Sequence, residues 1–124
     1  MEFIKALKEV GEVKSLYRVR QFYHLFVGEV ELSIQASEFH YSMPRETLEN
    51  IEDYDSFEVA LIGSKNKYVI EALEEYADFD IEDLDDINED SILVFSFVPK
   101  ELIEDLYNKL NKKSKHINKM KEVF

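Results

Sequence analysis

Residues 30–37 alternate strictly between apolar and polar side chains, and this pattern limits the folds open to the chain more than any other feature. The apolar members are Val30, Leu32, Ile34 and Ala36, and the polar members are Glu31, Ser33, Gln35 and Ser37. Because successive side chains of a strand point to opposite faces, the pattern predicts a half-buried strand with one solvent-exposed face. Residues 17–27, rich in aromatic and β-branched side chains, predict a preceding strand, and Gly28-Glu29 predicts a tight hairpin turn between the two.

Apolar residues at helical spacing predict helices over 2–10 and 67–77, and a third helix that begins at Pro99. Strands are predicted over 56–62 and 92–98, and the second is the most apolar of all, so we expect it at the centre of the sheet. The polar residues 45–55 predict a loop with a helical turn. The order α-β-β-β-α-β-α predicts an α+β fold, in which two to three helices pack on one face of an antiparallel sheet of about four strands.

The length and composition of the chain fit one compact domain. Of its 124 residues, 45% are hydrophobic and 13% aromatic, which is enough apolar material to fill one core. We expect a single α+β domain over residues 1–113, followed by a lysine-rich C-terminal tail over residues 114–124. The first residues lack the layout of a signal peptide, and no apolar run approaches the ~20 residues of a membrane span. Without cysteine there is no disulfide, so we expect a cytoplasmic protein that does not bind membranes.

Charge is distributed very unevenly along the sequence. Residues 1–45 carry six basic and six acidic groups and are neutral. Residues 46–107 carry twenty acidic groups against three lysines, a net charge of −17, whereas residues 108–124 carry six lysines against one glutamate, a net charge of +5. The total is −12. The middle of the chain therefore projects a negative field that attracts basic partners and repels nucleic acids.

The densest charge lies between residues 74 and 90, where ten of seventeen residues are acidic. As an ordered ridge, this stretch would imitate the backbone of a nucleic acid, which carries one charge per ~1.7 Å of duplex axis. Apolar residues interleaved with the acids would attach such a ridge to the core, whereas a solvated acidic loop would only aid solubility. The candidate partner-binding residues are Glu74, Glu75, Asp78, Asp80, Glu82, Asp83, Asp85, Asp86, Glu89 and Asp90.

Part of this stretch also has the spacing of a calcium-binding loop. Asp78, Asp80 and Glu82 occupy its first, third and fifth positions, and Glu89 occupies the twelfth. The sixth position is Asp83, however, and the sharp turn of such a loop requires glycine there. No pair of histidines has the spacing of metal ligands, so we expect neither a metal nor any other cofactor.

Candidate catalytic residues are few. His40 lies close in sequence to Ser37 and Ser42, but no nucleophile elbow surrounds either serine. Three glycines are too few for the usual phosphate-binding loops. The other two histidines are His24, within a predicted strand, and His116, in the lysine-rich tail. General acid–base catalysis by two of the many carboxylates leaves no sequence pattern and stays open as a third possibility. We expect a protein that acts by binding and not by catalysis.

Two segments of the chain stand out as sequence motifs. The first runs from Ser33 as SIQASEFHYSMPRE and continues to FEVA at residues 57–60, and the second is VFSFVPKELI at residues 94–103. Together they resemble a family of small acidic proteins encoded by bacteriophages and mobile elements. In that family a SIQAS-x-x-HY…PRE strand and loop precedes an EVA strand, and a strand-to-helix junction with Val-Pro lies near the C-terminus. The resemblance implies a phage or mobile-element origin. Small acidic phage proteins without catalytic motifs resemble inhibitors of host defence, including anti-CRISPR proteins that block DNA-binding grooves.

These observations predict a stoichiometric inhibitor of a host defence nuclease, which would bind the basic groove of that enzyme through residues 74–90 as a nucleic-acid mimic. Its partner would be a basic nucleic-acid-binding protein or nuclease of the host, and it would not bind nucleic acid directly. The alternative is a non-catalytic structural or regulatory module that binds a protein partner through the polar sheet face. The residues that would matter for the alternative are Glu31, Ser33, Gln35, His40 and Arg45.

Overall fold

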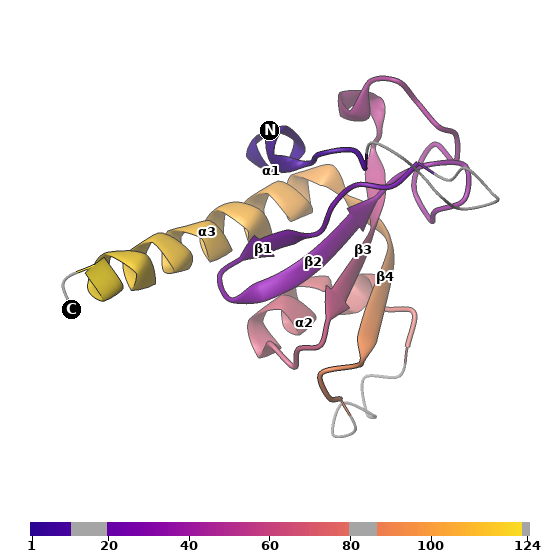
Figure 1. Ribbon diagram of the computed structural model, residues 1–124. Helices are drawn as coiled ribbons and strands as arrows, with labels where there is room; N and C mark the ends of the chain where they lie inside the picture. The colour runs from indigo at the N-terminus through magenta and orange to yellow at the C-terminus, as the bar shows by residue number, and fades with distance from the viewer. Residues whose placement is uncertain (11–19, 80–86, 123–124) are drawn as a thin grey trace.

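The computed structural model describes residues 1–10, 20–79 and 87–122 (Figure 1). Its elements follow the order α-β-β-β-α-β-α, which confirms the order predicted from the sequence. The helices are α1 (Glu2–Ala6), α2 (Lys67–Leu73) and α3 (Lys100–Glu122), and the strands are β1 (Leu25–Val27), β2 (Val30–Gln35), β3 (Ser56–Ile62) and β4 (Ile92–Pro99). The described residues also form the 3-10 turns η1 (Ile51–Asp53) and η2 (Glu74–Tyr76). The turn η1 is the helical turn predicted within residues 45–55.

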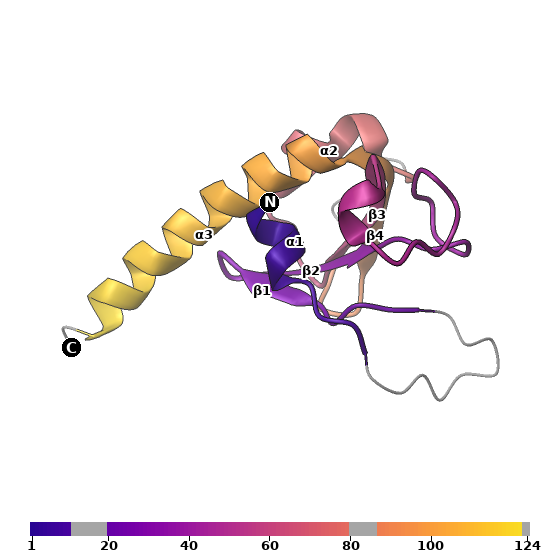
Figure 2. The same ribbon diagram turned by 90° about the horizontal axis from the view of Figure 1, so that it is seen from above.

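The four strands form one antiparallel sheet in the order β1-β2-β3-β4. Each strand pairs with its neighbour in sequence, so no connection crosses the sheet. Helices α2 and α3 lie behind the sheet in Figure 1, and the view from above in Figure 2 shows α1 beside α3 on the same side. The predicted α+β fold, a four-stranded antiparallel sheet with helices on one face, is confirmed.

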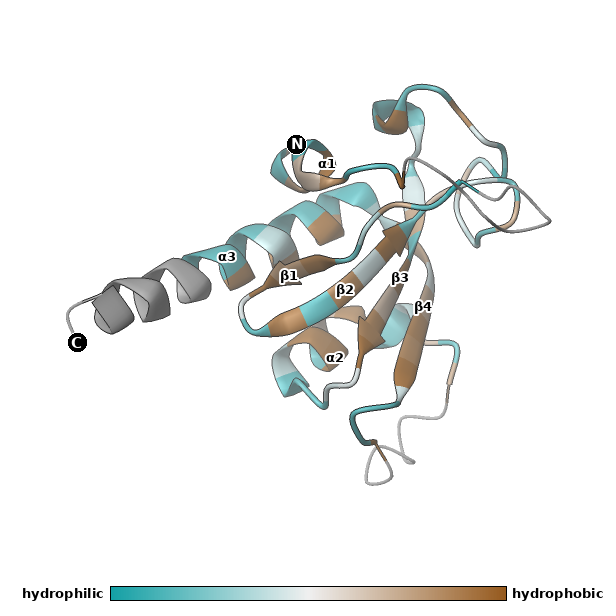
Figure 3. Cartoon of the chain, viewed as in Figure 1, coloured by the Kyte–Doolittle hydropathy of each residue, from teal (hydrophilic) through white to brown (hydrophobic). Residues whose placement is uncertain are grey.

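The core lies between the sheet and these helices. Cross-strand pairing places Leu32 opposite Leu61 and Leu61 opposite Leu93, and all three side chains are buried on the helix-covered face. The predicted burial of alternate residues from Val30 to Ala36 is confirmed. Figure 3 shows the apolar residues concentrated in the strands and in patches along the helices. The helices contribute buried residues three or four positions apart, namely Val69, Ile70 and Leu73 from α2 and Ile103, Leu106 and Leu110 from α3.

Helix α1 is shorter than the predicted helix over 2–10, because it ends at Ala6. Its start is held by a tertiary contact: the carboxylate of Glu104 in α3 accepts the backbone N–H groups of Glu2 and Phe3 at 2.9 and 3.0 Å. These donors have no partner within the helix itself, so an acidic side chain from another element takes the place of a local cap. Burial of the Phe3 side chain then fixes α1 against the core.

The predicted strand over 17–27 is wrong in its extent. Only Leu25–Val27 pair with β2, and the first three residues of the predicted strand lie outside the described residues. Residues 21–23 pair with residues 8–10 through backbone hydrogen bonds of 2.8 and 2.9 Å. The side-chain amide of Gln35 replaces the missing strand contact, since it bonds both the N–H and the C=O of Phe22, at 2.8 and 2.9 Å. Gln35 is therefore buried, although the alternation predicted it on the exposed face.

The most apolar strand, β4, lies at the edge of the sheet and not at its centre as predicted. Its outer edge is covered by two loops. The backbone N–H of Asp78 donates to the C=O of Val94 at 2.9 Å, and the N–H of Phe97 donates to the C=O of Tyr41 at 3.0 Å. These loops shield the strand much as a neighbouring strand would, which accounts for the apolar composition of an edge strand.

Helix α3 is the longest element of the structure, and its C-terminal part extends beyond the sheet (Figure 1). Residues 114–122, predicted as part of a lysine-rich tail, continue this helix. The strand β4 includes Pro99, so the helix predicted to begin at Pro99 begins one residue later. Within the described residues, no helix has both the length and the apolar character required to cross a bilayer.

The turn between β1 and β2 yields a first testable prediction. Gly28 and Glu29 both have positive φ, 56° and 65°, as in a type I′ hairpin turn. A Cβ atom on Gly28 would lie 2.9 Å from both Cβ and the backbone oxygen of Leu110. We expect Gly28→Ala to lower the free energy of unfolding by about 2 kcal/mol, because alanine is strained at this φ and presses against α3.

Urea denaturation of the Gly28→Ala variant measures this effect. Glu29→Gly is the matched control in the same turn, because glycine adopts the positive φ of that position without strain. We expect the control to stay within about 1 kcal/mol of the parent protein. Equal stability of the two variants would show that the contact of Gly28 with Leu110 is not tight.

Candidate protein-interaction surface

The acidic stretch that the sequence singled out is only partly described. Glu74 and Glu75 lie in η2, Asp78 lies beside the edge of β4, and Glu89 and Asp90 lie in the turn before β4. The other predicted binding residues lie outside the described residues, and they are Asp80, Glu82, Asp83, Asp85 and Asp86.

Apolar residues at both ends of this stretch hold it against the core. The ring of Phe79 meets the ring of Phe95 edge-on, with 5.3 Å between centroids, and Ile87 is half-buried against the core. The prediction that interleaved apolar residues attach the segment is confirmed at these two positions. Among the residues that the structure describes, no group of three histidine or acidic side chains is placed to hold a metal ion.

A contact that resembles a catalytic pair, between Ser37 and His40, belongs to a turn. The Ser37 hydroxyl lies 2.7 Å from Nδ1 of His40, but Ser37 is fully buried and its oxygen accepts the N–H of Phe39 at 3.0 Å. Ser42 is also buried, and its hydroxyl bonds the backbone oxygens of Ser37 and Pro44. These two hydroxyls stabilise the loop after β2 and are not accessible to a substrate.

That loop carries several exposed apolar side chains. Phe39, Tyr41 and Met43 are exposed although they alternate with the buried or half-buried His40 and Ser42. The backbone of Tyr41 is fastened to two strands: its N–H donates to Oε2 of Glu58 in β3 at 3.0 Å, and its C=O accepts the N–H of Phe97 in β4. The loop therefore presents its aromatic residues from a backbone that two strands hold in place.

A β-bulge in β4 brings Phe97 to the same place. Phe57 pairs with Val98 and Val59 pairs with Phe95, so both Ser96 and Phe97 lie opposite Glu58. The additional residue lets Phe95 and Val98 both face the core, while Phe97 turns outward and is 38% exposed. Its ring lies 5.9 Å from that of Tyr41.

The backbone of Phe97 is strained, because its φ is +54°. A bulky aromatic residue in this region costs of order 1–3 kcal/mol. Arg45 completes the group, since its guanidinium lies over the Tyr41 ring at 5.1 Å from the centroid. We call Tyr41, Arg45 and Phe97 the aromatic pad.

Next to the aromatic pad, His40 is held in its uncharged form. Burial lowers the pKa of His40, the carboxylate of Glu58 acts in the opposite direction, and the guanidinium of Arg20 lowers the pKa further. Nδ1 of the neutral ring can then accept a hydrogen bond from the Ser37 hydroxyl. The negative charge of Glu58 is consequently not balanced by His40 at neutral pH.

This lowered pKa predicts how stability depends on pH. The stabilisation by neutral His40 is fully present above the unfolded-state pKa of about 6.5 and is lost as the pH falls through the lower pKa of the folded protein. We expect the free energy of unfolding, measured with urea, to decrease as the pH is lowered through and below about 6.5. His40→Asn keeps an acceptor for Ser37 but does not titrate, so its stability should fall less. An identical fall in the variant would exclude His40 as the cause.

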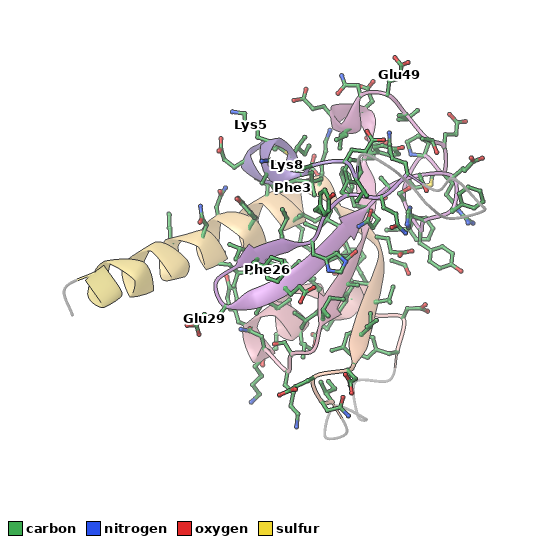
Figure 4. The ribbon with its side chains drawn as sticks, in the orientation of Figure 1. Phe3, Lys5, Lys8, Phe26, Glu29 and Glu49 are labelled. Atoms are coloured by element: carbon green, nitrogen blue, oxygen red, sulfur yellow. The ribbon has the colours of Figure 1, made fainter. Side chains whose placement is uncertain are left out.

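The aromatic pad adjoins a sheet face that no described helix covers, which we call the open face. One row across it consists of Phe26, Glu31, Ile62 and Ile92, paired in succession from β1 to β4. Figure 4 shows Phe26 on β1 in front of the sheet, and its side chain is 78% exposed. Glu31 bonds Nδ1 of His24 at 2.6 Å. A hollow of about 350 Å³ lies beside Phe26, lined by Val10, Gln21, Phe22, Tyr23 and His24.

Of the residues predicted for this face, Glu31 and Ser33 lie on it half-buried, Gln35 is buried, and Arg45 belongs to the aromatic pad. The sequence reasoning missed Tyr41 and Phe97. The alternation of exposed and buried residues from Phe39 to Met43 could have indicated the first, whereas the bulge that exposes Phe97 leaves no sequence signal.

Comparisons of this chain with protein-family models, with curated proteins and with solved structures gave no match. The resemblance to phage and mobile-element proteins therefore stays a prediction.

Proposed function

We propose that the protein is a non-catalytic interaction module that binds a protein partner through the open face and the aromatic pad. The observation that carries this proposal is the uneven covering of the sheet: α2 and α3 pack on one face only. On and beside the other face, large apolar side chains stay exposed at Phe26, Phe39, Tyr41, Met43, Ile92 and Phe97. Exposed apolar patches of this kind are typical of protein–protein interfaces, where aromatic residues and arginine are enriched.

The strained Phe97 gives the proposal further support. A left-handed phenylalanine destabilises the fold, and its exposed ring recovers only part of the burial that a core position would give. Strain of this kind is concentrated at ligand clamps and active sites. In the proposed function, the free energy gained when a partner binds to the ring of Phe97 offsets the free-energy cost of this strain.

A second candidate is the acidic mimic, favoured by the net charge of −17 in residues 46–107. In this function the chain inhibits a host defence nuclease, of anti-CRISPR type, by occupying its basic groove. The described residues of this candidate site are Glu74, Glu75, Asp78, Glu89 and Asp90, and its other members lie within residues 80–86.

Capture of partners from a bacterial lysate at two salt concentrations separates the two functions. Tagged protein is incubated at about 0.05 M and about 0.5 M salt, and bound proteins are identified by mass spectrometry. The interaction module predicts a partner that persists at high salt and is lost with Tyr41→Ala. The acidic mimic predicts a nucleic-acid-binding protein recovered at low salt only, and lost when Asp80, Asp83, Asp85 and Asp86 become asparagine. A partner unaffected by Tyr41→Ala would contradict the interaction module.

A further inference from the structure

We propose that the aromatic pad is an arginine-binding site: it takes an arginine side chain of the partner, whose guanidinium stacks on the exposed rings and pairs with the carboxylate of Glu58. This inference rests on the proposed interaction module, and it names the chemistry of the partner that the module recognises.

The fold already uses stacked guanidinium groups at two places. Arg45 lies over the ring of Tyr41 at 5.1 Å from the centroid. Arg20 lies over the rings of Phe22 and Tyr54, at 5.1 and 5.8 Å, while Nη2 donates to the Tyr54 hydroxyl. All three distances fall within the ~6 Å over which a cation is attracted to a ring face. A further guanidinium at the aromatic pad would repeat a geometry that these rings already adopt.

The aromatic pad lies beside a carboxylate, that of Glu58, which can pair with a cation from a partner. Glu58 is half-buried and accepts the N–H of Tyr41 through Oε2, and within the described residues no lysine, arginine or histidine nitrogen lies within 4 Å of its carboxylate. Because the Glu58 carboxylate has no cationic partner among the described residues, a partner's guanidinium could form a charge-assisted bond with it without displacing an existing ion pair. Glu38 adds a second negative charge in the same loop. The guanidinium of Arg45 already lies over the Tyr41 ring, and that of Arg20 is already bonded to the backbone oxygens of Ala36 and Leu48.

Two other occupants fit this surface less well. A second copy of the chain would bring together two molecules of net charge −12, which repel each other. A partner strand cannot add to β4 at the aromatic pad, because the N–H of Phe97 is already bonded to the C=O of Tyr41. Recognition here therefore depends on side chains. Arginine fits better than lysine because its planar, weakly hydrated guanidinium both stacks on rings and pairs with carboxylates.

The test uses a short peptide and three matched forms of it. The probe is acetyl-Gly-Ser-Leu-Arg-Leu-Arg-Ser-Gly-amide, and its relatives carry lysine, citrulline or glutamate in place of both arginines. Citrulline has nearly the shape of arginine but no charge. Binding is followed by NMR chemical shifts of the full-length protein. We expect the shifts to concentrate at Tyr41, Glu58 and Phe97, with affinity about tenfold weaker for the citrulline form and intermediate for the lysine form.

Variants of the protein separate recognition from folding. Phe97→Asn removes the ring but suits the left-handed backbone, so the domain should stay folded and lose about tenfold in affinity. Tyr68→Ala, in helix α2 on the opposite side of the sheet and exposed to nearly the same extent as Phe97, should bind as the parent does. Glu58→Gln keeps the acceptor for Tyr41 and should weaken binding, whereas Arg45→Gln removes a like charge and should strengthen it several-fold.

Three results would overturn the proposal: equal binding of the citrulline form, weaker binding to Arg45→Gln, or the absence of shifts at the aromatic pad. If the peptide fails while a lysate partner persists at high salt and is lost with Phe97→Asn, arginine is the wrong chemistry and the interaction module stands. If the partner also ignores Phe97→Asn, both proposals fail. Chemical-shift changes confined to Glu74, Glu75 and Asp78 would show that the peptide binds the acidic stretch and not the aromatic pad.

Discussion

Replacement of Phe57 by alanine is expected to lower the free energy of unfolding by about 4 kcal/mol. Phe57 is fully buried, and its ring meets that of Phe3 edge-on at 5.5 Å and that of Tyr54 at 5.6 Å. Alanine removes these contacts and leaves a cavity that α1, β3 and the loop before β3 can fill only by moving closer together. Since a whole domain is stable by about 5–15 kcal/mol, one substitution would remove a large share of this stability.

Urea denaturation followed by circular dichroism measures the effect of Phe57→Ala. Phe57→Leu is the control, because it keeps most of the apolar volume and should cost about 1–2 kcal/mol. A loss below about 1 kcal/mol for the alanine variant would mean that the contact between α1 and the sheet contributes little.

Replacement of Tyr54 by phenylalanine is expected to lower the free energy of unfolding by about 3 kcal/mol, although only one atom is removed. The buried hydroxyl of Tyr54 donates to the backbone oxygen of Glu46 and accepts the N–H of Leu48 at 2.7 Å and Nη2 of Arg20 at 2.8 Å. Without it, three polar groups lose a partner in a place where water does not replace it easily.

Tyr41→Phe is the control for this hydroxyl effect, since Tyr41 is exposed and should lose less than about 0.5 kcal/mol. A double-mutant cycle with Arg20→Leu measures the coupling through the hydroxyl, which we expect to exceed about 1 kcal/mol because the two groups are in direct contact. Additive effects of the two substitutions would contradict a shared network.

The elements with a clear period were predictable. The alternation from Val30 to Ala36 and the apolar runs at 56–62 and 92–98 predicted three strands within one or two residues. The helices at 67–77 and after Pro99 were equally clear, because their buried residues recur every three or four positions. These signals are local, since the period of burial is a property of each element by itself.

The predictions that failed depended on neighbours that are remote in sequence. The aromatic residues of 17–27 favour a strand, yet residues 21–23 pair with residues 8–10 and not with β2. The apolar character of β4 suggested a central strand, but covering loops, and not a fifth strand, bury its edge. The strand propensity of a segment does not tell which other segment will lie beside it in the sheet. Such errors arise because tertiary packing overrides the local preference.

The candidate site divides in the same way. Composition shows an acidic, cysteine-free chain, and the carboxylates of residues 74–90 are visible in the sequence. The aromatic pad is not visible there, because its rings come from the loop after β2 and from the strand β4, more than fifty residues apart. The chain brings them together through the bulge opposite Glu58 and the bonds of the Tyr41 backbone.

By itself, the sequence determined the order and type of the elements, the single apolar core and the concentration of negative charge, because each follows from local periodicity or from simple composition. Only the tertiary structure decided which sheet face stays open, which strand forms the edge and that Phe97 turns outward. The physical reason is that strand register and bulges are set by hydrogen bonds and packing between remote segments, and one additional residue in a strand reverses the face of every side chain after it.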